Sequence, residues 1–285
     1  HMATIQDFTG YTPTWCAGCG NWGIGRSVMT ALTESGYSPD GACIMFDIGC
    51  SGNSNDFINA YAMHTLHGRS IPTAIGVKLA NHDLPVIVMG GDGSLYGEGG
   101  NHFLHACRAN HDITVIVHDN SVYGLTKGQA SPMADQGYKT KTSPPDGTIE
   151  TPINPLVLAI TQGASFVAQT FAGNVPHLVQ TIKNGVAHKG FSLINVLQPC
   201  VTFNKVNTYG YYFQKSYQLK EHDPTNLSAA ISLAMQAELE EKFPLGTLFE
   251  IDKPAFHAQL PQLSEQTLLQ HQPHRLSDDI LKLYS

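Results

Sequence analysis

Residues 84–93 read LPVIVMGGDG, and this stretch indicates both the fold and the place of a binding site. The run Val86–Met89 is apolar at every position, as expected of a strand that is buried on both faces of a parallel sheet. A turn containing three glycines and Asp92 follows at the carboxyl end of that strand. Open α/β sheets bind ligands at this end of their strands. Glycines there let the backbone approach a phosphate, and a carboxylate can hold Mg²⁺.

Apolar strands and amphipathic helices alternate on either side of this stretch. We expect helices over residues 21–36, 70–82, 97–110, 154–164 and 175–190, and further strands over residues 42–49, 112–120, 165–171 and 191–200. Such alternation predicts an α/β fold, with an open, mostly parallel sheet that has helices on both faces. The segment 124–151 is rich in Gly, Ser, Thr, Pro and Lys, and it predicts a long loop of the functional or mobile kind.

The chain after Cys200 differs in character from the part before it. An aromatic, polar segment leads to an expected helix over residues 223–241, capped by Asp223 or Thr225, and then to a strand over residues 246–251. We expect residues 12–200 to form the main domain. Residues 201–285 then form a C-terminal extension that packs on this domain, rather than a second independent core.

Composition excludes several classes of protein. The 285 residues carry a formal net charge of −7 and no basic run, which argues against nucleic-acid binding. No apolar run reaches transmembrane length, and the segment after His1 and Met2, which look like a cloning remnant, lacks the features of a signal peptide. We therefore expect a cytoplasmic protein without membrane contact. In a reducing compartment, metal or cluster ligation is the leading use for any of the six cysteines that converge.

A second polar strand end strengthens the expectation of a metal site. Twenty-six residues separate Gly93 from Asn120, and they contain an expected helix and an expected strand. Asn120 therefore also follows a strand, which we expect to be the neighbour of the strand before Asp92. Asp92, Asn120 and the carbonyl of Val122 can supply oxygen ligands for Mg²⁺, with a diphosphate and a water completing the octahedron. Taken alone, an Asp-Gly pair is about as often an ordinary turn.

The pattern G-D-G, twenty-six residues, then Asn is the motif of enzymes that bind thiamine diphosphate. The surrounding sequence is more specific and contains five blocks: CAGCGNWGI (16–24), GCSG (49–52), HTLHGRSIPTAIGVKLAN (64–81), NHFLHA (101–106) and DNSVYGLTKGQASP (119–132). From about Thr12 to about Cys200, the chain resembles the β subunit of the 2-oxoacid:ferredoxin oxidoreductases. Two positions depart from the family pattern without removing a ligand: Asp119 stands where a second Asn is common, and Ala17 replaces the Pro of C-P-G-C-G.

The resemblance implies thiamine diphosphate and Mg²⁺ as cofactors and coenzyme A as co-substrate. It gives Asp92, Asn120 and the carbonyl of Val122 as the Mg²⁺ ligands. The residues that it implies around thiamine diphosphate are Ser51, Gly52, His67, Gly91, Asp92, Gly93, Ser94, Asn120, Tyr123, Gly124, Leu125 and Thr126.

The cysteine pair Cys16–Cys19 is open to two interpretations from the residues alone, because four thiolates suit either zinc or an iron–sulfur cluster. The resemblance implies one [4Fe–4S] cluster, held by Cys16, Cys19, Cys50 and Cys200. Cys50 and Cys200 both follow expected parallel strands, which places them at the same sheet edge as Asp92. The other two cysteines, Cys43 and Cys107, are interpreted as core thiols.

Four side chains are candidates for direct roles in catalysis or substrate choice. The resemblance places His67 against the diphosphate or the thiazolium ring, and it associates Leu125, Asn53 and Lys127 with the substrate. A flexible cation at position 127 can bind the substrate carboxylate. The plain alternatives are a histidine at a helix end and a solvated loop lysine.

The implied reaction is the oxidative decarboxylation of a 2-oxoacid to an acyl-CoA and CO₂, with 2-oxoglutarate favoured and pyruvate as the alternative. Electrons pass through the cluster to ferredoxin, and the reaction can also run in reverse. An α subunit would supply the glutamate that faces the aminopyrimidine, so we expect little activity from this chain alone. Two rival interpretations are a non-redox thiamine diphosphate lyase with structural zinc and a degenerate scaffold that only keeps a partner folded.

Overall fold

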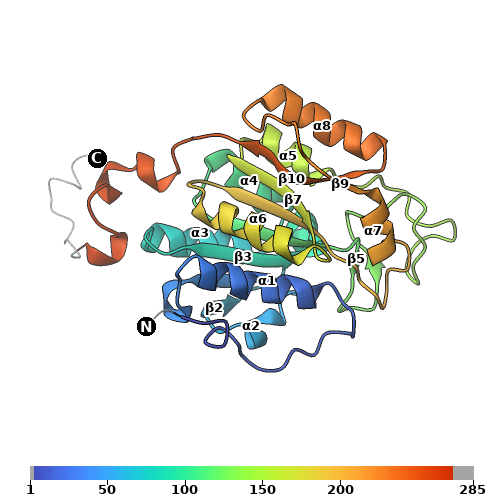
Figure 1. The fold of residues 1–285 in the computed structure, drawn as a ribbon, viewed down its shortest axis with the longest axis horizontal. Coiled ribbons are helices and arrows are strands. Elements are labelled where there is room, and N and C mark those ends of the chain that lie inside the picture. Colours follow the sequence, from blue (N-terminus) through green and yellow to red (C-terminus); the bar gives the residue numbers. More distant parts are fainter. Residues whose placement is uncertain (1–2, 272–285) are drawn as a thin grey trace, which may run out of the picture.

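The computed structural model describes residues 3–271, and its centre is an eight-stranded sheet (Figure 1). The strand order is β2-β1-β3-β4-β8-β7-β10-β9. The strands span β1 Cys43–Phe46, β2 Tyr61–His64, β3 Val86–Gly91, β4 Thr114–Asp119, β7 Phe166–Phe171, β8 Ser192–Leu197, β9 Ser216–Gln218 and β10 Phe243–Glu250. In this order, the six neighbouring strands β2, β1, β3, β4, β8 and β7 run parallel to one another. Strand β10 pairs with β7 in the antiparallel direction. The expected α/β class with an open, mostly parallel sheet is confirmed.

Helices cover both faces of this sheet (Figure 1). One face carries α1 (Asn21–Glu34) and α6 (Val175–Ala187), and the other carries α3 (Ser70–Ala80), α4 (Gly100–Ala109), α5 (Pro155–Thr161) and α8 (Leu227–Leu239). The remaining elements are short: α2 Ser54–Phe57, α7 Tyr209–Lys215, a hairpin of β5 Val122–Tyr123 and β6 Gln129–Ala130, a π-helical turn Gly93–Glu98, and single 3₁₀ turns. None of the helices within residues 3–271 has the length and apolar character that crossing a bilayer requires.

Strand β3 shows why the sequence is apolar at every position from 86 to 89. Val86 and Val88 pack into the core beneath α3, α4, α5 and α8, while Ile87 and Met89 pack into the core beneath α1 and α6. All four side chains are 2% exposed or less. Burial of each such side chain stabilises the fold by roughly 1.5–3 kcal/mol. Strand β3 therefore contributes to the packing of the helices on both faces of the sheet.

The register of the central strands brings their carboxyl ends together. Gly91 of β3 pairs with His118 of β4, and Asp119 of β4 pairs with Leu197 of β8. The residues that follow these strands therefore leave the sheet side by side. The expectation that Asn120 follows the neighbour of the strand before Asp92 is confirmed.

Three local expectations need correction or extension. The cap of α8 is Asn226, whose side chain accepts the Ala229 N–H at 3.0 Å, whereas Asp223 accepts the N–H and hydroxyl of Thr225 before the helix. Strand β10 begins at Phe243, three residues earlier than expected. The edge strand β2 was not expected, because all four of its residues are exposed and carry no pattern of burial.

The segment 124–151 contains only β6 as regular structure. Its turns are tied to the rest of the molecule, for example by the Tyr138 hydroxyl, which donates to the Phe203 carbonyl at 3.2 Å. The expected long loop is confirmed. Residues 272–285, the end of the expected C-terminal extension, lie outside the described residues.

Candidate functional site

A cavity of about 230 Å³ opens at the carboxyl ends of β1, β3 and β4. Its lining contains most of the residues that the resemblance implied: Cys50, Ser51, His67, Gly91, Asp92, Gly93, Ser94, Asn120, Val122, Tyr123, Gly124, Leu125 and Thr126. Ile48, Gly49, His118 and Gln198 complete it. Segments that are far apart in the chain thus build one concave surface.

Asp92 places a carboxylate in this cavity at a position that is almost closed to solvent. The residue is 1% exposed, and its carboxylate accepts the Ser121 N–H at 2.9 Å and the Ser131 hydroxyl. Burial raises the pKa of this carboxyl to about 6, although these hydrogen bonds oppose the rise. A bound cation would offset the cost of burying the charge, so the environment suits a metal ligand.

Asn120 and Val122 add neutral oxygens next to this carboxylate. The Asn120 side chain donates through Nδ2 to Gln198 Oε1 at 2.6 Å, which leaves Oδ1 as its acceptor end. That oxygen accepts the Val122 N–H at 3.1 Å and retains a second lone pair. One carboxylate, one amide oxygen and one carbonyl form a set of hard oxygen donors, as Mg²⁺ prefers.

Asp119 faces a different region from Asp92. It lines a second cavity of about 510 Å³, and its carboxylate accepts the Asn195 amide at 3.0 Å. Burial, and then the charge of Asp92, raise the pKa of this carboxyl to about 8. The departure from the family pattern at this position therefore leaves the oxygen donors of the first cavity in place.

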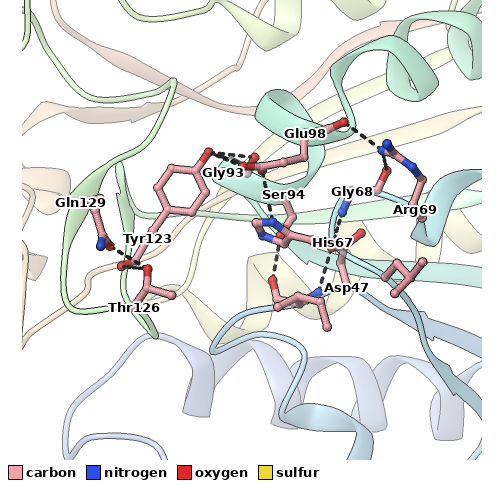
Figure 2. Close-up of polar contacts among 12 residues, drawn as sticks. Asp47, His67, Gly68, Arg69, Gly93, Ser94, Glu98, Tyr123, Thr126 and Gln129 are labelled. Carbon is pink, nitrogen blue, oxygen red and sulfur yellow. Dashed lines mark hydrogen bonds and ion pairs between the residues drawn. The ribbon is translucent and has the colours of Figure 1, made fainter.

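Glu98 connects the residues on one wall of the cavity (Figure 2). Its carboxylate lies 3.5 Å from His67 Nδ1 and accepts the Tyr123 hydroxyl at 3.3 Å, while its backbone carbonyl accepts from Arg69 at 3.1 Å. Arg69 thereby holds the loop rather than facing the cavity. Burial, and then the charge of Glu98, raise the pKa of Tyr123, so its hydroxyl stays protonated and remains a donor.

The loop that carries His67 is fixed from below by Asp47. This buried carboxylate accepts the backbone N–H of Ile48 and of Gly68, each at 2.8 Å, together with the N–H and hydroxyl of Ser70. Four hydrogen bonds satisfy both carboxylate oxygens. The position of His67 is therefore set by the end of β1 as well as by its own loop.

Four cysteines converge beside the cavity. Cys19 has its thiol pKa raised to about 12 by burial and by the charges of the other three sulfurs, and Cys50 has its pKa raised to about 11 by burial, Cys200 and Cys16. A Cβ at Gly124 would lie 3.5 Å from Cys50 Sγ and 3.6 Å from Cys200 Sγ. The absence of a side chain at position 124 leaves space in front of both sulfurs.

These four thiols are candidate ligands for an inorganic group. All six cysteines are free thiols, and among the described residues no three His, Cys, Asp or Glu side chains lie close enough together to hold a single metal ion. Four thiolates in one region suit either zinc or an iron–sulfur cluster as the bound group.

Two tryptophans hold the loop of Cys16 and Cys19 in place. Trp15 donates through its indole N–H to the Cys50 carbonyl at 2.8 Å, and Trp22 donates to the Cys16 carbonyl at 3.1 Å. The turn is closed by the Cys19 N–H, which donates to the Cys16 carbonyl at 3.0 Å, so Ala17 does not open it.

Besides Cys16, Cys19 and Cys200, three of the implied residues lie outside the cavity lining. Gly52 packs against the Asp47 carbonyl, Asn53 occupies the position before α2, and Lys127 is exposed on the turn after Thr126. Lys127 has a φ of 84°, a left-handed conformation that is unusual for a residue with a side chain. Cys43 and Cys107 are both buried in the core, as expected.

Sequence reasoning missed four polar residues of the site: Asp47, Glu98, Ser131 and Gln198. Asp47 and Gln198 follow strands β1 and β8, so the rule that identified Asp92 could also have identified them. Glu98 and Ser131 carry no such signal, because their roles arise from the π-helical turn and from the loop after β6.

Comparison with known proteins gives consistent matches along the chain. Residues 47–196 match the family described as "Thiamine pyrophosphate enzyme, C-terminal TPP binding domain", and residues 200–265 match the family of the C-terminal part of the "Pyruvate ferredoxin oxidoreductase beta subunit". A 2-oxoacid:ferredoxin oxidoreductase subunit beta from Saccharolobus solfataricus is 45% identical over 83% of this chain and 81% of its own length. A 2-oxoglutarate synthase subunit KorB from Methanocaldococcus jannaschii is 36% identical over 88% of this chain and 93% of its own length.

A solved structure matches nearly the whole chain. It is described as 2-oxoglutarate:ferredoxin oxidoreductase from Magnetococcus marinus with 2-oxoglutarate, coenzyme A and succinyl-CoA bound. The TM-score is 0.91 at 36% identity, and the match covers 99% of this chain and 96% of that one.

Proposed function

The chain belongs to the β subunits of the 2-oxoacid:ferredoxin oxidoreductases, and from this membership we propose that it catalyses the oxidative decarboxylation of 2-oxoglutarate to succinyl-CoA and CO₂. The observation that carries the proposal is the convergence of Asp92, Asn120 and four cysteines around one cavity. The names of the KorB relatives and the 2-oxoglutarate in the matched structure support the choice of substrate. Pyruvate is the second candidate, because residues 200–265 match a family named for pyruvate.

The cavity residues have separate parts in this proposal. Asp92, Asn120 and the Val122 carbonyl hold Mg²⁺, and the cavity surface around Gly91, Gly93 and Ser94 receives the diphosphate. Thiamine diphosphate, when bound, supplies a nucleophilic carbon and an acceptor for the electrons left by loss of CO₂. His67, oriented by Glu98, exchanges protons or donates a hydrogen bond at the reacting end.

Substrate recognition is assigned to the mouth of the cavity. Lys127 binds a carboxylate of the 2-oxoacid, and Leu125 and Asn53 shape the space around its side chain. Lys127 is exposed and forms no ion pair with another described residue, so its charge is available to a substrate. Its left-handed backbone conformation supports a functional constraint at this position.

The four convergent thiols hold a [4Fe–4S] cluster in this proposal. Such a cluster accepts electrons one at a time and can pass them to ferredoxin. The cysteines lie at the same sheet edge as the cavity, which supports a short path for electrons in either direction, and we propose that the reaction is reversible.

A partner chain completes the site. Leu125 lines the cavity and is 48% exposed, and Leu66, the neighbour of His67, is 79% exposed. Exposed apolar side chains at a cavity mouth are typical of a surface that is buried against another protein chain. We propose that this mouth is closed by an α subunit, and that the C-terminal extension from residue 201 packs on the main domain and on that partner. Six free thiols support a cytoplasmic location.

The proposal is tested on the anaerobically purified complex of this chain with its α-subunit partner. Viologen reduction that depends on coenzyme A is measured with 2-oxoglutarate and with pyruvate, alongside iron, sulfide and zinc content. We expect about four irons in this chain and faster reduction with 2-oxoglutarate. Preference for pyruvate would overturn the substrate, zinc without iron would favour the lyase, and failure to bind thiamine diphosphate with Mg²⁺ would favour the scaffold.

A further inference from the structure

Gln198 occupies the narrow region between the two groups of ligands. It directly follows β8, and its backbone N–H donates to the Asp119 carbonyl at 2.7 Å. The residue is 1% exposed, so water does not compete for its side-chain amide. A buried amide must find partners for both its donor and its acceptor end.

The two ends of this amide contact different ligand sets. Oε1 accepts Asn120 Nδ2 at 2.6 Å, and Nε2 donates to Cys19 Sγ at 3.3 Å and to the Pro199 carbonyl at 2.8 Å. One side chain therefore contacts both a residue assigned to Mg²⁺ and a residue assigned to the cluster.

The backbone of Gly20 packs closely against this side chain. A Cβ at Gly20 would lie 2.7 Å from the Gln198 Cγ, so a glycine at position 20 allows the amide to fill this space. Gly20 is itself held, because its N–H donates to the Pro199 carbonyl at 3.1 Å. The loop of Cys16–Cys19 and the end of β8 thus fix the orientation of Gln198 together.

We propose that Gln198 is a positioning residue that acts on both centres at once: its carbonyl orients Asn120 toward Mg²⁺, and its N–H stabilises negative charge on the Cys19 sulfur. This proposal rests on the proposed function. With Nδ2 engaged by Gln198, the Asn120 amide presents Oδ1 to the cavity. A hydrogen bond to a ligating sulfur favours the more negative, reduced state of a cluster and raises its reduction potential.

Two substitutions separate these roles. Gln198→Glu keeps an oxygen that can accept from Asn120 but has no N–H for Cys19, whereas Gln198→Met removes both contacts at similar volume. Each variant is made in the complete complex. Thiamine diphosphate affinity is measured by calorimetry with saturating Mg²⁺, and the cluster potential by a redox titration followed by electron paramagnetic resonance.

We expect the cluster potential to become more negative in both variants. Affinity for thiamine diphosphate with Mg²⁺ should fall by roughly tenfold in Gln198→Met, the scale found for outer-shell partners, and by less than twofold in Gln198→Glu. A general loosening of the fold would not lower the cluster potential in both variants while lowering the affinity for thiamine diphosphate in only one of them. The matched control is Gln169→Met, a buried glutamine of β7 that contacts neither Asn120 nor Cys19, and it should change neither quantity.

Unchanged affinity and potential in Gln198→Met, in a complex with full iron content and cluster signal, would overturn the coupling and leave the proposed function intact. A wild-type complex without a cluster signal would instead reject the proposed cluster, and the coupling with it.

Discussion

At the scale of single residues, the site depends on charges and polar groups that are kept away from water. Asp92 is the case that bears on metal binding, because burial raises its pKa while a serine hydroxyl and backbone N–H groups stabilise its charge. A carboxylate in such an environment weakens the empty protein and strengthens the binding of a cation. Stability and binding are therefore expected to respond in opposite ways when this charge is removed.

The substitution Asp92→Asn tests this relation. Asparagine keeps an oxygen for the Ser121 N–H and the Ser131 hydroxyl but loses the charge, so we expect the free energy of unfolding of the protein without cofactors to stay equal or to rise. Affinity for thiamine diphosphate with Mg²⁺ should fall by at least about 100-fold, beyond the range for outer-shell ligand partners. Calorimetry and chemical denaturation measure the two effects, and retained affinity would show that Asp92 is not a metal ligand.

Lys127 gives a second prediction at this scale. If it binds the substrate carboxylate, Lys127→Ala should raise the KM for 2-oxoglutarate by roughly 10–100-fold, the worth of a hydrogen bond to a charged group. Lys127→Arg should recover part of the loss. Lys141 is an exposed lysine of the same long loop, and Lys141→Ala serves as the control. Steady-state kinetics with equal KM values in the two alanine variants would remove Lys127 from the substrate site.

At the scale of elements, the candidate ligands lie at the carboxyl ends of the strands, and a stabilising ion pair lies at their amino ends. Cys50, Asp92, Asn120 and Cys200 follow the carboxyl ends of β1, β3, β4 and β8. Near the amino ends, Lys78 of α3 forms a buried ion pair of 2.8 Å with Asp112, the residue shortly before β4. Lys78 also donates to the Leu84 carbonyl at 2.8 Å, so it joins α3 to the segments that lead into β3 and β4.

Breaking this ion pair should affect stability alone. Lys78→Met leaves the Asp112 carboxylate buried without its partner, which costs about 3–5 kcal/mol in comparable cases. The double variant with Asp112→Asn should recover much of the loss. Denaturation gives the free energy of unfolding for each variant. If the affinity for thiamine diphosphate fell in parallel with stability, the two ends of the strands would not have separate roles.

The sequence predicted the central elements well, because β1, β3, β4, β7 and β8 are mostly apolar, are buried on both faces and alternate with helices. Through spacing and resemblance it also predicted that Asp92, Asn120 and the cysteines lie in one region, whereas their roles as ligands stay a prediction. It did not predict β2, whose exposed residues show no pattern, nor the cap of α8, where Asp223, Thr225 and Asn226 were all possible caps. Glu98 and Ser131 were missed because a π-helical turn and a loop, rather than a periodic element, bring them to the cavity.

At the scale of the whole molecule, half-buried histidines connect stability with pH. Burial lowers the pKa of His111, His177, His188 and His257. A histidine with a lowered pKa in the folded state binds its proton more readily when the chain is unfolded. The stability that depends on these neutral histidines is therefore lost as the pH falls below about 6.5, the value for an unfolded chain.

His188 offers a test of this effect. Its Nε2 lies 2.7 Å from the Ser165 hydroxyl, and glutamine can replace the hydrogen bond without taking up a proton. Between pH 7.5 and pH 5.5, the free energy of unfolding of His188→Gln should decline less than that of the wild type. Urea denaturation of the protein without cofactors at both pH values measures the difference, and parallel declines would show that His188 does not contribute.

The four convergent sulfurs also have a consequence for how the molecule is made. Cys16 and Cys19 precede α1, Cys50 follows β1, and Cys200 follows β8, which comes after β1, β3, β4 and β7 in the chain. During synthesis the first three thiols leave the ribosome long before the fourth. The complete set therefore exists only once Cys200 has been synthesised, so the proposed cluster of four thiolates would form late, and a chain that stalls before Cys200 would offer three sulfurs instead of four.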